Sequence, residues 1–272
     1  MTARCTLPLA LALLAAAAPA RAQLPASGEE ALARLEASPR HGEWIRYDAG
    51  GGDMVEAWLV YPERSDPAPV VIVIHEIGGL SDWIRAVADQ LAAEGFIAIA
   101  PDMLSGKGPD GGGTSSFDRE AVGRAIRDLD RGEINRRLRA AGEHAMALPA
   151  ASDRVGVVGY CWGGSSSWLL AVDWADLAAA VVYYGTSPEE GYADVQAPVL
   201  GLYGGDDNRV NATIPAAEEA MGALGKPYEP HVYEGAGHGF LRNQSGQDGA
   251  NLSATEQAWP RTVAFFREHL GR

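Results

Sequence analysis

A cysteine between two glycines is the residue in this sequence best placed for nucleophilic chemistry. The segment Gly159–Gly163 reads Gly-Tyr-Cys-Trp-Gly; it follows the apolar run Val155–Val158 and precedes an apolar stretch, Ser166–Val172. This order predicts a strand, a sharp turn and a helix, with the side chain at the turn apex projecting above the sheet. Glycines suit the flanking positions because a Cβ there would clash with the neighbouring strand and helix. The thiolate is the nucleophilic form of cysteine, and a helix N-terminus favours it. The alternative is that Cys161 is a small buried apolar residue.

Carboxylate and histidine side chains follow two later predicted strands. Asp206 and Asp207 come after the run Pro198–Leu202, and His238 comes after the next predicted strand, between two glycines. A nucleophile needs a base within hydrogen-bond reach, and a carboxylate that holds the imidazole in the right tautomer. The chain order Cys, Asp, His fits such a triad, and spacing alone leaves Asp206 and Asp207 as alternatives. His75 precedes the nucleophile, so we expect it to pack or bond locally. His238 as a surface residue and the aspartates as turn formers are the alternative interpretations.

The elements that position these residues alternate between strand and helix patterns. Continuous apolar runs such as Val70–Ile74 predict strands buried on both faces, and turn residues at 48–53 separate two alternating segments that predict a hairpin. The expected strands are 41–47, 54–61, 69–75, 96–100, 155–160, 177–184, 198–203 and 229–233, and the expected helices are 29–35, 81–94, 117–148 (one or two), 166–172, 212–224 and 255–270. The pattern predicts an α/β fold in one domain, 23–272, with a mostly parallel, doubly wound sheet and an antiparallel N-terminal hairpin. In such sheets the functional site lies at the carboxyl ends of the strands.

A glycine-rich stretch, 103–116, lacks the order GxxxxGK[ST] of a phosphate-binding loop. We expect a flexible loop at the rim of a cleft. The sequence has no set of histidines and carboxylates with metal-ligand spacing. No metal or other cofactor is therefore expected.

The first 22 residues have the organisation of a secretory signal peptide. Arg4 precedes the apolar run Leu7–Ala18, and Ala20–Ala22 forms a small-x-small cleavage site. The run is too short to span a bilayer. We expect an exported protein, periplasmic or secreted, that starts near Gln23. Cys5 would be removed, so Cys161 would be the one remaining cysteine and internal disulfides are excluded.

The charge balance excludes some partners. The whole chain carries a net charge of −14, and removal of the signal peptide would leave −16. Such a chain is repelled by nucleic acid and by anionic membranes. We expect a protein that binds no nucleic acid, has no membrane contact after cleavage and is a monomer.

Taken together, these motifs resemble those of the dienelactone hydrolase family of α/β-hydrolases. The matching segments are His75-Glu76-Ile77-x-Gly79, Gly159-x-Cys161-x-Gly163-Gly164, Tyr183-Tyr184-Gly185, Tyr203-Gly204-x-x-Asp207 and Gly235-x-Gly237-His238-x-Phe240-x-Arg242. They are spread over nearly the whole sequence after the signal peptide. Cysteine in the elbow together with glutamate in the H-E-x-x-G loop is the most specific part of the match.

The resemblance implies an α/β-hydrolase fold and hydrolysis of small esters or lactones through a Cys-His-Asp triad and a thioester intermediate. It implies Cys161 as nucleophile, His238 as base and Asp207, in preference to Asp206, as the residue that orients the base. It also implies that Glu76 contacts the resting thiol and helps to move its proton. The backbone N–H groups of Ile77 and Trp162 would form the oxyanion hole.

The resemblance also implies substrate contacts. Arg242 matches an arginine that holds a substrate carboxylate in the family, and Tyr184 lies in a motif we expect at the substrate, so an anionic substrate is one expectation. A surface arginine is the alternative. The family's second substrate arginine falls between 119 and 137, where the sequence leaves open Arg119, Arg124, Arg127, Arg131, Arg136 and Arg137. Gly78 stands where the family commonly has an aromatic residue, which predicts an altered pocket floor. The alternative functions are a broader carboxylesterase or acyl hydrolase, and a ligand-binding homologue without turnover.

Overall fold

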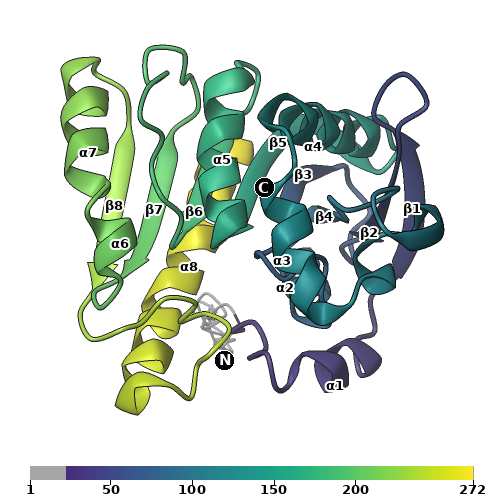
Figure 1. Ribbon diagram of the computed structural model, residues 1–272, viewed down its shortest axis with the longest axis horizontal. Helices are drawn as coiled ribbons and strands as arrows, with labels where there is room; N and C mark the ends of the chain where they lie inside the picture. Colours follow the sequence, from purple (N-terminus) through teal and green to yellow (C-terminus); the bar gives the residue numbers. More distant parts are fainter. Residues whose placement is uncertain (1–22, 272) are drawn as a thin grey trace, which may run out of the picture.

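The computed structural model describes residues 23–271, so the predicted signal peptide lies outside the described residues. The described chain is built around one eight-stranded sheet with strand order β1-β2-β4-β3-β5-β6-β7-β8 (Figure 1). The strands are β1 (Gly42–Asp48), β2 (Met54–Val60), β3 (Ala68–Ile74), β4 (Ile97–Pro101), β5 (Ala151–Tyr160), β6 (Ala179–Tyr183), β7 (Val199–Gly204) and β8 (Tyr228–Tyr233). The predicted hairpin is confirmed: β1 and β2 are antiparallel, and β2 is also antiparallel to β4. The remaining neighbours are all parallel.

Helices cover both faces of this sheet. The α-helices are α1 (Ala31–Glu36), α2 (Asp82–Ala93), α3 (Arg119–Arg127), α4 (Arg131–Met146), α5 (Trp162–Asp173), α6 (Asn208–Asn211), α7 (Ile214–Ala223) and α8 (Ala250–Leu270). Residues of α3, α4, α5 and α7 belong to one apolar core, and residues of α1, α2 and α8 belong to a second core on the other face (Figure 1). The fold is therefore the doubly wound α/β arrangement that the sequence predicts.

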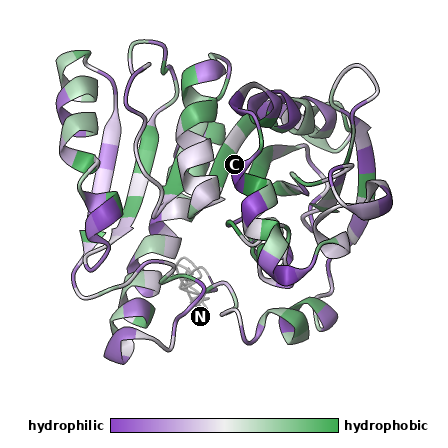
Figure 2. Ribbon diagram, viewed as in Figure 1, coloured by the Kyte–Doolittle hydropathy of each residue, from purple (hydrophilic) through white to green (hydrophobic). Residues whose placement is uncertain are grey.

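The central strand β3 shows why its sequence is a continuous apolar run. All seven of its residues are buried. Val70 and Ile72 contribute to the first core, whereas Val71 and Val73 contribute to the second. A strand covered on both faces needs apolar side chains at every position. In Figure 2 strands near the centre of the sheet are mainly green, while α4 is mainly purple. Within residues 23–271 no helix is long and apolar enough to cross a membrane.

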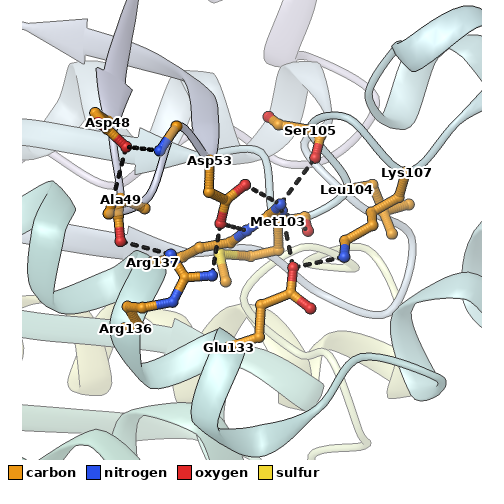
Figure 3. A network of polar contacts seen from close by, with 12 residues as sticks. Asp48, Ala49, Asp53, Met103, Leu104, Ser105, Lys107, Glu133, Arg136 and Arg137 are labelled. Atoms are coloured by element: carbon orange, nitrogen blue, oxygen red, sulfur yellow. Dashed lines mark hydrogen bonds and ion pairs between the residues drawn. The ribbon is translucent and has the colours of Figure 1, made fainter.

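A buried arginine fixes the glycine-rich loop that follows β4. The side chain of Arg137 is 2% exposed and donates from Nε and Nη2 to the two carboxylate oxygens of Asp53, at 2.9 and 2.6 Å (Figure 3). It also donates to the carbonyl oxygens of Met103 and Ser105, at 2.8 and 3.1 Å. The stretch 103–116 is thus tied to α4 and to the turn between β1 and β2. None of its residues lines the pocket described below, so the prediction of a loop at the cleft rim is wrong.

Candidate active site

Cys161 lies at the apex of the predicted elbow, between the last residue of β5 and the first residue of α5. Its φ of 57° and ψ of −115° fall where non-glycine residues are rare, at a cost of about 1–3 kcal/mol. A Cβ at Gly159 would lie 1.9 Å from the carbonyl oxygen of Gly163. A Cβ at Gly163 would lie 2.5 Å from the carbonyl oxygen of His75. Both glycines are required by close backbone approach, which also presses the elbow against the loop after β3.

Asp207 is the aspartate that reaches the predicted base. Its Oδ2 accepts a hydrogen bond from Nδ1 of His238 at 2.5 Å, and its side chain is 8% exposed. It follows β7 and caps α6, where its Oδ1 accepts from the N–H of Val210 at 3.5 Å. Asp206 is exposed, and its backbone N–H binds the carbonyl oxygen of Ala236. The structure therefore separates the two aspartates that spacing alone left open.

His238 is linked to both Asp207 and Cys161. The neighbouring Cys161 side chain is the main cause that raises the pKa of His238 to about 9; burial opposes this rise, and the hydrogen bond to Asp207 adds to it. With Nδ1 bound to Asp207, Nε2 is the nitrogen left for the thiol. The arrangement favours a protonated imidazole beside the sulfur at neutral pH.

Glu76 and Arg242 form an ion pair in the same pocket. Arg242 Nε lies 2.9 Å from Glu76 Oε2, and the two side chains are 44% and 15% exposed. Burial raises the pKa of Glu76, and the charges of Arg242 and His238 oppose this rise. Among the described residues Glu76 pairs with Arg242, which differs from the resting contact between Glu76 and the thiol that we predicted.

The two predicted oxyanion donors lie on either side of the elbow. The N–H of Trp162 occupies the first position of α5, where a helix offers no acceptor. Neither this N–H nor that of Ile77 donates to a backbone acceptor within residues 23–271. The structure therefore leaves both donors available for a ligand.

His75 fixes the peptide that carries one of these donors. It is fully buried, and its Nδ1 donates to the carbonyl oxygen of Glu76 at 2.8 Å while its Nε2 accepts from the N–H of Met103 at 3.3 Å. The N–H of Gly79 binds the same Glu76 carbonyl at 3.0 Å. Because a trans peptide points its N–H opposite to its carbonyl, these bonds set the direction of the Ile77 N–H. Burial lowers the pKa of His75, which keeps the ring neutral. The expectation that His75 bonds locally is confirmed.

A cavity of about 990 Å³ brings the predicted residues together. Cys161, His238, Glu76, Ile77 and Arg242 all line it, from the ends of β3, β5 and β8. These positions are the carboxyl ends of parallel strands, where the fold was expected to carry its site.

The outer part of the cavity is formed by segments whose place at the site the sequence predicted only in part. It is lined by the starts of α2 and α3, the loop that follows Arg242, and an N-terminal segment, Ser27–Glu29. Arg119 is the one arginine of the six alternatives that lines this cavity in the described structure. Arg136 and Arg137 bind Asp53 instead. Sequence gave no signal that Ser27–Glu29 would reach the site.

Tyr184 does not contact the cavity directly, so the prediction that it binds substrate needs correction. Its side chain is fully buried, and its φ of 40° turns the chain directly after β6. Its ring centroid lies 5.1 Å from that of the His238 ring, at an interplanar angle of 60°. Tyr184 therefore supports the imidazole from inside the protein. Within residues 23–271 no group of His, Cys, Asp or Glu is arranged to hold a metal ion.

The parallel sheet, the elbow and the order of the loops define the chain as an α/β-hydrolase. It belongs to the dienelactone hydrolase family, whose sequence model matches residues 55–270. A candidate carboxymethylenebutenolidase of Escherichia coli K12 is 32% identical over 234 residues, which cover 81% of this chain and 85% of that protein. A candidate 2-oxo-3-(5-oxofuran-2-ylidene)propanoate lactonase of Bradyrhizobium is 29% identical and covers 84% and 94%. The crystal structure of a dienelactone hydrolase-like promiscuous phosphotriesterase from metagenomic libraries has a TM-score of 0.74 at 26% identity, and covers 85% and 99%.

Proposed function

We propose that this protein hydrolyses small carboxylic esters or lactones through Cys161, His238 and Asp207, with a thioester intermediate and no cofactor. Membership of the dienelactone hydrolase family supports a hydrolase of ester or lactone bonds. The observation that supports the triad is that Cys161 and His238 line one cavity while Asp207 holds His238. The strained elbow presents Cys161, the Cys161 side chain raises the pKa of His238, and Asp207 accepts a hydrogen bond from Nδ1 of His238.

In the first half of the proposed reaction the thiolate of Cys161 attacks the carbonyl carbon, and the carbonyl electrons move to oxygen. The N–H groups of Ile77 and Trp162 bind this oxyanion; loss of one such donor typically costs about 3–4 kcal/mol. As the oxyanion collapses, the carbon–oxygen bond of the leaving group breaks. Protonated His238 gives its Nε2 proton to the leaving oxygen, which becomes an alcohol. The acyl group remains as a thioester on Cys161.

In the second half His238, now neutral, removes a proton from water. The hydroxide attacks the thioester carbonyl, and the carbon–sulfur bond breaks when the second oxyanion collapses. The sulfur leaves as the thiolate beside the imidazolium, and the carboxylic acid product departs. Asp207 holds the ring in the tautomer that both halves require.

Glu76 has a different place in this proposal. Burial raises its pKa, so it accepts a proton more readily than an exposed glutamate does. The reaction above starts from the thiolate and protonated His238, so we propose that Glu76 accepts a proton only where the thiol is still protonated, and that its main role is to hold Arg242.

The charges around the cavity argue for an uncharged substrate rather than the anionic one expected from Arg242. Four carboxylates and two guanidinium groups line it: Glu29, Glu76, Asp82, Glu120, Arg119 and Arg242. Arg242 is already paired with Glu76. We therefore propose a neutral ester or lactone as the better substrate, because an additional carboxylate would enter a cavity with an excess of negative charge.

Export remains a proposal that rests on residues 1–22 alone. N-terminal sequencing of protein recovered outside the cytoplasm should start near Gln23. Protein that keeps Met1 and remains in the cytoplasm would contradict this proposal.

The experiment that tests the proposed function is a rate assay on a neutral aryl ester and an anionic enol lactone. We expect turnover of the neutral ester to be faster, and Cys161→Ala to abolish turnover of both. Mass spectrometry of the wild type, quenched during turnover, should show an acyl adduct on Cys161. A folded wild type that turns over neither compound would contradict the proposal. A Cys161→Ala variant that keeps its rate would remove Cys161 as nucleophile.

A further inference from the structure

The N-terminal segment Leu24–Glu30 lies at the active-site cavity although it is remote in sequence from the other site residues. Ser27, Gly28 and Glu29 line the cavity together with Cys161. The match to the dienelactone hydrolase family begins only at residue 55. This segment is therefore a part of the cavity wall that the family match does not include.

Three hydrogen bonds hold the segment in place. The N–H of Gly28 donates to the carbonyl oxygen of Arg242 at 2.8 Å. Trp83 Nε1, on α2, donates to the carbonyl oxygen of Ala26 at 3.0 Å. Gln244 Nε2 donates to the carbonyl oxygen of Pro25, also at 3.0 Å. Ala26 is 1% exposed and belongs to the core beside α2. The segment is fixed on both sides of the cavity, so it is a built wall.

Gly28 is the point where this wall meets the charged part of the site. A Cβ at Gly28 would lie 3.0 Å from Cγ and 3.6 Å from Cδ of Arg242. The backbone of Gly28 has no left-handed φ, so a larger residue is compatible with its conformation. Because Gly28 has no side chain, the aliphatic stem of Arg242 fits beside it. Arg242 Nε is held there by Glu76.

We propose that the segment Leu24–Glu30 determines substrate size, and that Gly28 sets the width of the cavity beside Arg242. This inference rests on the proposed ester or lactone hydrolysis. A side chain at position 28 has to displace the Arg242 stem or fill the cavity. Groups that extend from the reacting carbonyl past Arg242 are then excluded, whereas a short substrate still reaches the thiol.

The test compares wild type, Gly28→Val and Gly28→Ala on aryl esters with acyl chains of two to eight carbons. Gly222→Ala on α7 is the matched control, because a Cβ at Gly222 meets nothing within 4 Å. A misfit of one or two methyl groups in a pocket changes kcat/KM by about 10- to 200-fold. We expect Gly28→Val to lose at least about tenfold on the longest ester, mainly through KM, and to change less than about twofold on the shortest. On the longest ester, kcat/KM of Gly28→Ala should lie between the values of the wild type and Gly28→Val.

A second readout needs no turnover. Alkylation of Cys161 by a small reagent, iodoacetamide, is compared with alkylation by a bulky N-aryl maleimide in the same variants. We expect Gly28→Val to slow the bulky reagent selectively. Equal losses for all chain lengths, or an unchanged ratio of the two alkylation rates in the folded variant, would overturn the inference. If the wild type hydrolyses none of the esters but Gly28→Val still slows the bulky reagent selectively, the inference about the N-terminal segment holds and the proposed hydrolysis is refuted.

Discussion

Replacing Asp207 by asparagine tests the link between the geometry of the site and turnover. The carboxylate is 8% exposed and accepts the Nδ1 proton of His238 at 2.5 Å. It also caps α6 through Val210, but asparagine is as good a helix cap as aspartate. Asp207→Asn should therefore keep the fold while it removes the negative charge behind the imidazole.

The expected loss follows from two contributions. A hydrogen bond to a charged group contributes about 1.5–3 kcal/mol, and each 1.36 kcal/mol corresponds to about a tenfold change in rate. Loss of this bond alone predicts a decrease in kcat of about 10- to 150-fold. If the asparagine turns its NH₂ group to Nδ1, the proton of the neutral imidazole must sit on Nε2. His238 then cannot accept a proton on the Cys161 side, and the total loss approaches about 10⁴-fold, as in serine triads.

The assay is kcat and kcat/KM on a neutral aryl ester, with thermal unfolding measured on the same samples. Asp206→Asn is the matched control, because Asp206 is exposed and does not reach the imidazole. We expect that control to stay within about twofold of the wild type, as surface substitutions usually do. A loss in Asp206→Asn equal to that in Asp207→Asn, or a loss below about threefold in Asp207→Asn, would refute the role given to Asp207.

Two further predictions concern protonation and stability. The pKa of His238 is raised to about 9, chiefly by the neighbouring Cys161 side chain. The contribution of His238 to stability is therefore complete below about pH 6.5 and is lost as the pH rises through 9. The rate of ester hydrolysis should fall over the same alkaline pH range. Cys161→Ser should move the titration of His238, followed by NMR, to lower pH. An unchanged titration would contradict the effect of Cys161 on the pKa of His238. Arg137→Met should lower the free energy of unfolding in urea by about 3–5 kcal/mol, because it leaves the carbonyl oxygens of Met103 and Ser105 without this donor and leaves Asp53 paired with Arg136 alone. Arg136→Met, at a 44% exposed arginine, should lower it by less than about 1 kcal/mol, and similar losses in both variants would contradict the effect of burial.

The sequence could predict the sheet and the elbow because local chemistry alone decides both. A strand buried on two faces requires an apolar residue at every position, as β3 shows. The elbow at Cys161 requires glycine on both sides, since a Cβ at either glycine would overlap neighbouring backbone. The order of the loops then predicted His238 and one of Asp206 and Asp207 beside it, and the family resemblance favoured Asp207. The doubly wound fold and the antiparallel hairpin were predicted correctly for the same reason.

The sequence could not predict which side chains face the cavity where it allowed several side-chain orientations. Tyr184 directly follows a strand at the correct edge, but its backbone turns with φ of 40° and its ring is buried behind His238. The six arginines between 119 and 137 differ only in helix position and partner. Arg137 is buried against Asp53, whereas Arg119 at the start of α3 lines the cavity. These directions depend on tertiary packing, which no local pattern records.

The hydrogen bonds divide this site into a fixed part and an adjustable part. The Ile77 peptide is fixed, because His75 and Gly79 both bind the carbonyl of Glu76 and His75 is itself held by Met103. Arg137 in turn binds the carbonyl of Met103, so the support continues into the ion pair that this buried arginine forms with Asp53. Arg242, by contrast, is 44% exposed and holds only one partner at its guanidinium among the described residues. Changes of substrate range should therefore arise at the N-terminal wall and around Arg242, while changes near His75 should lower kcat for every substrate alike.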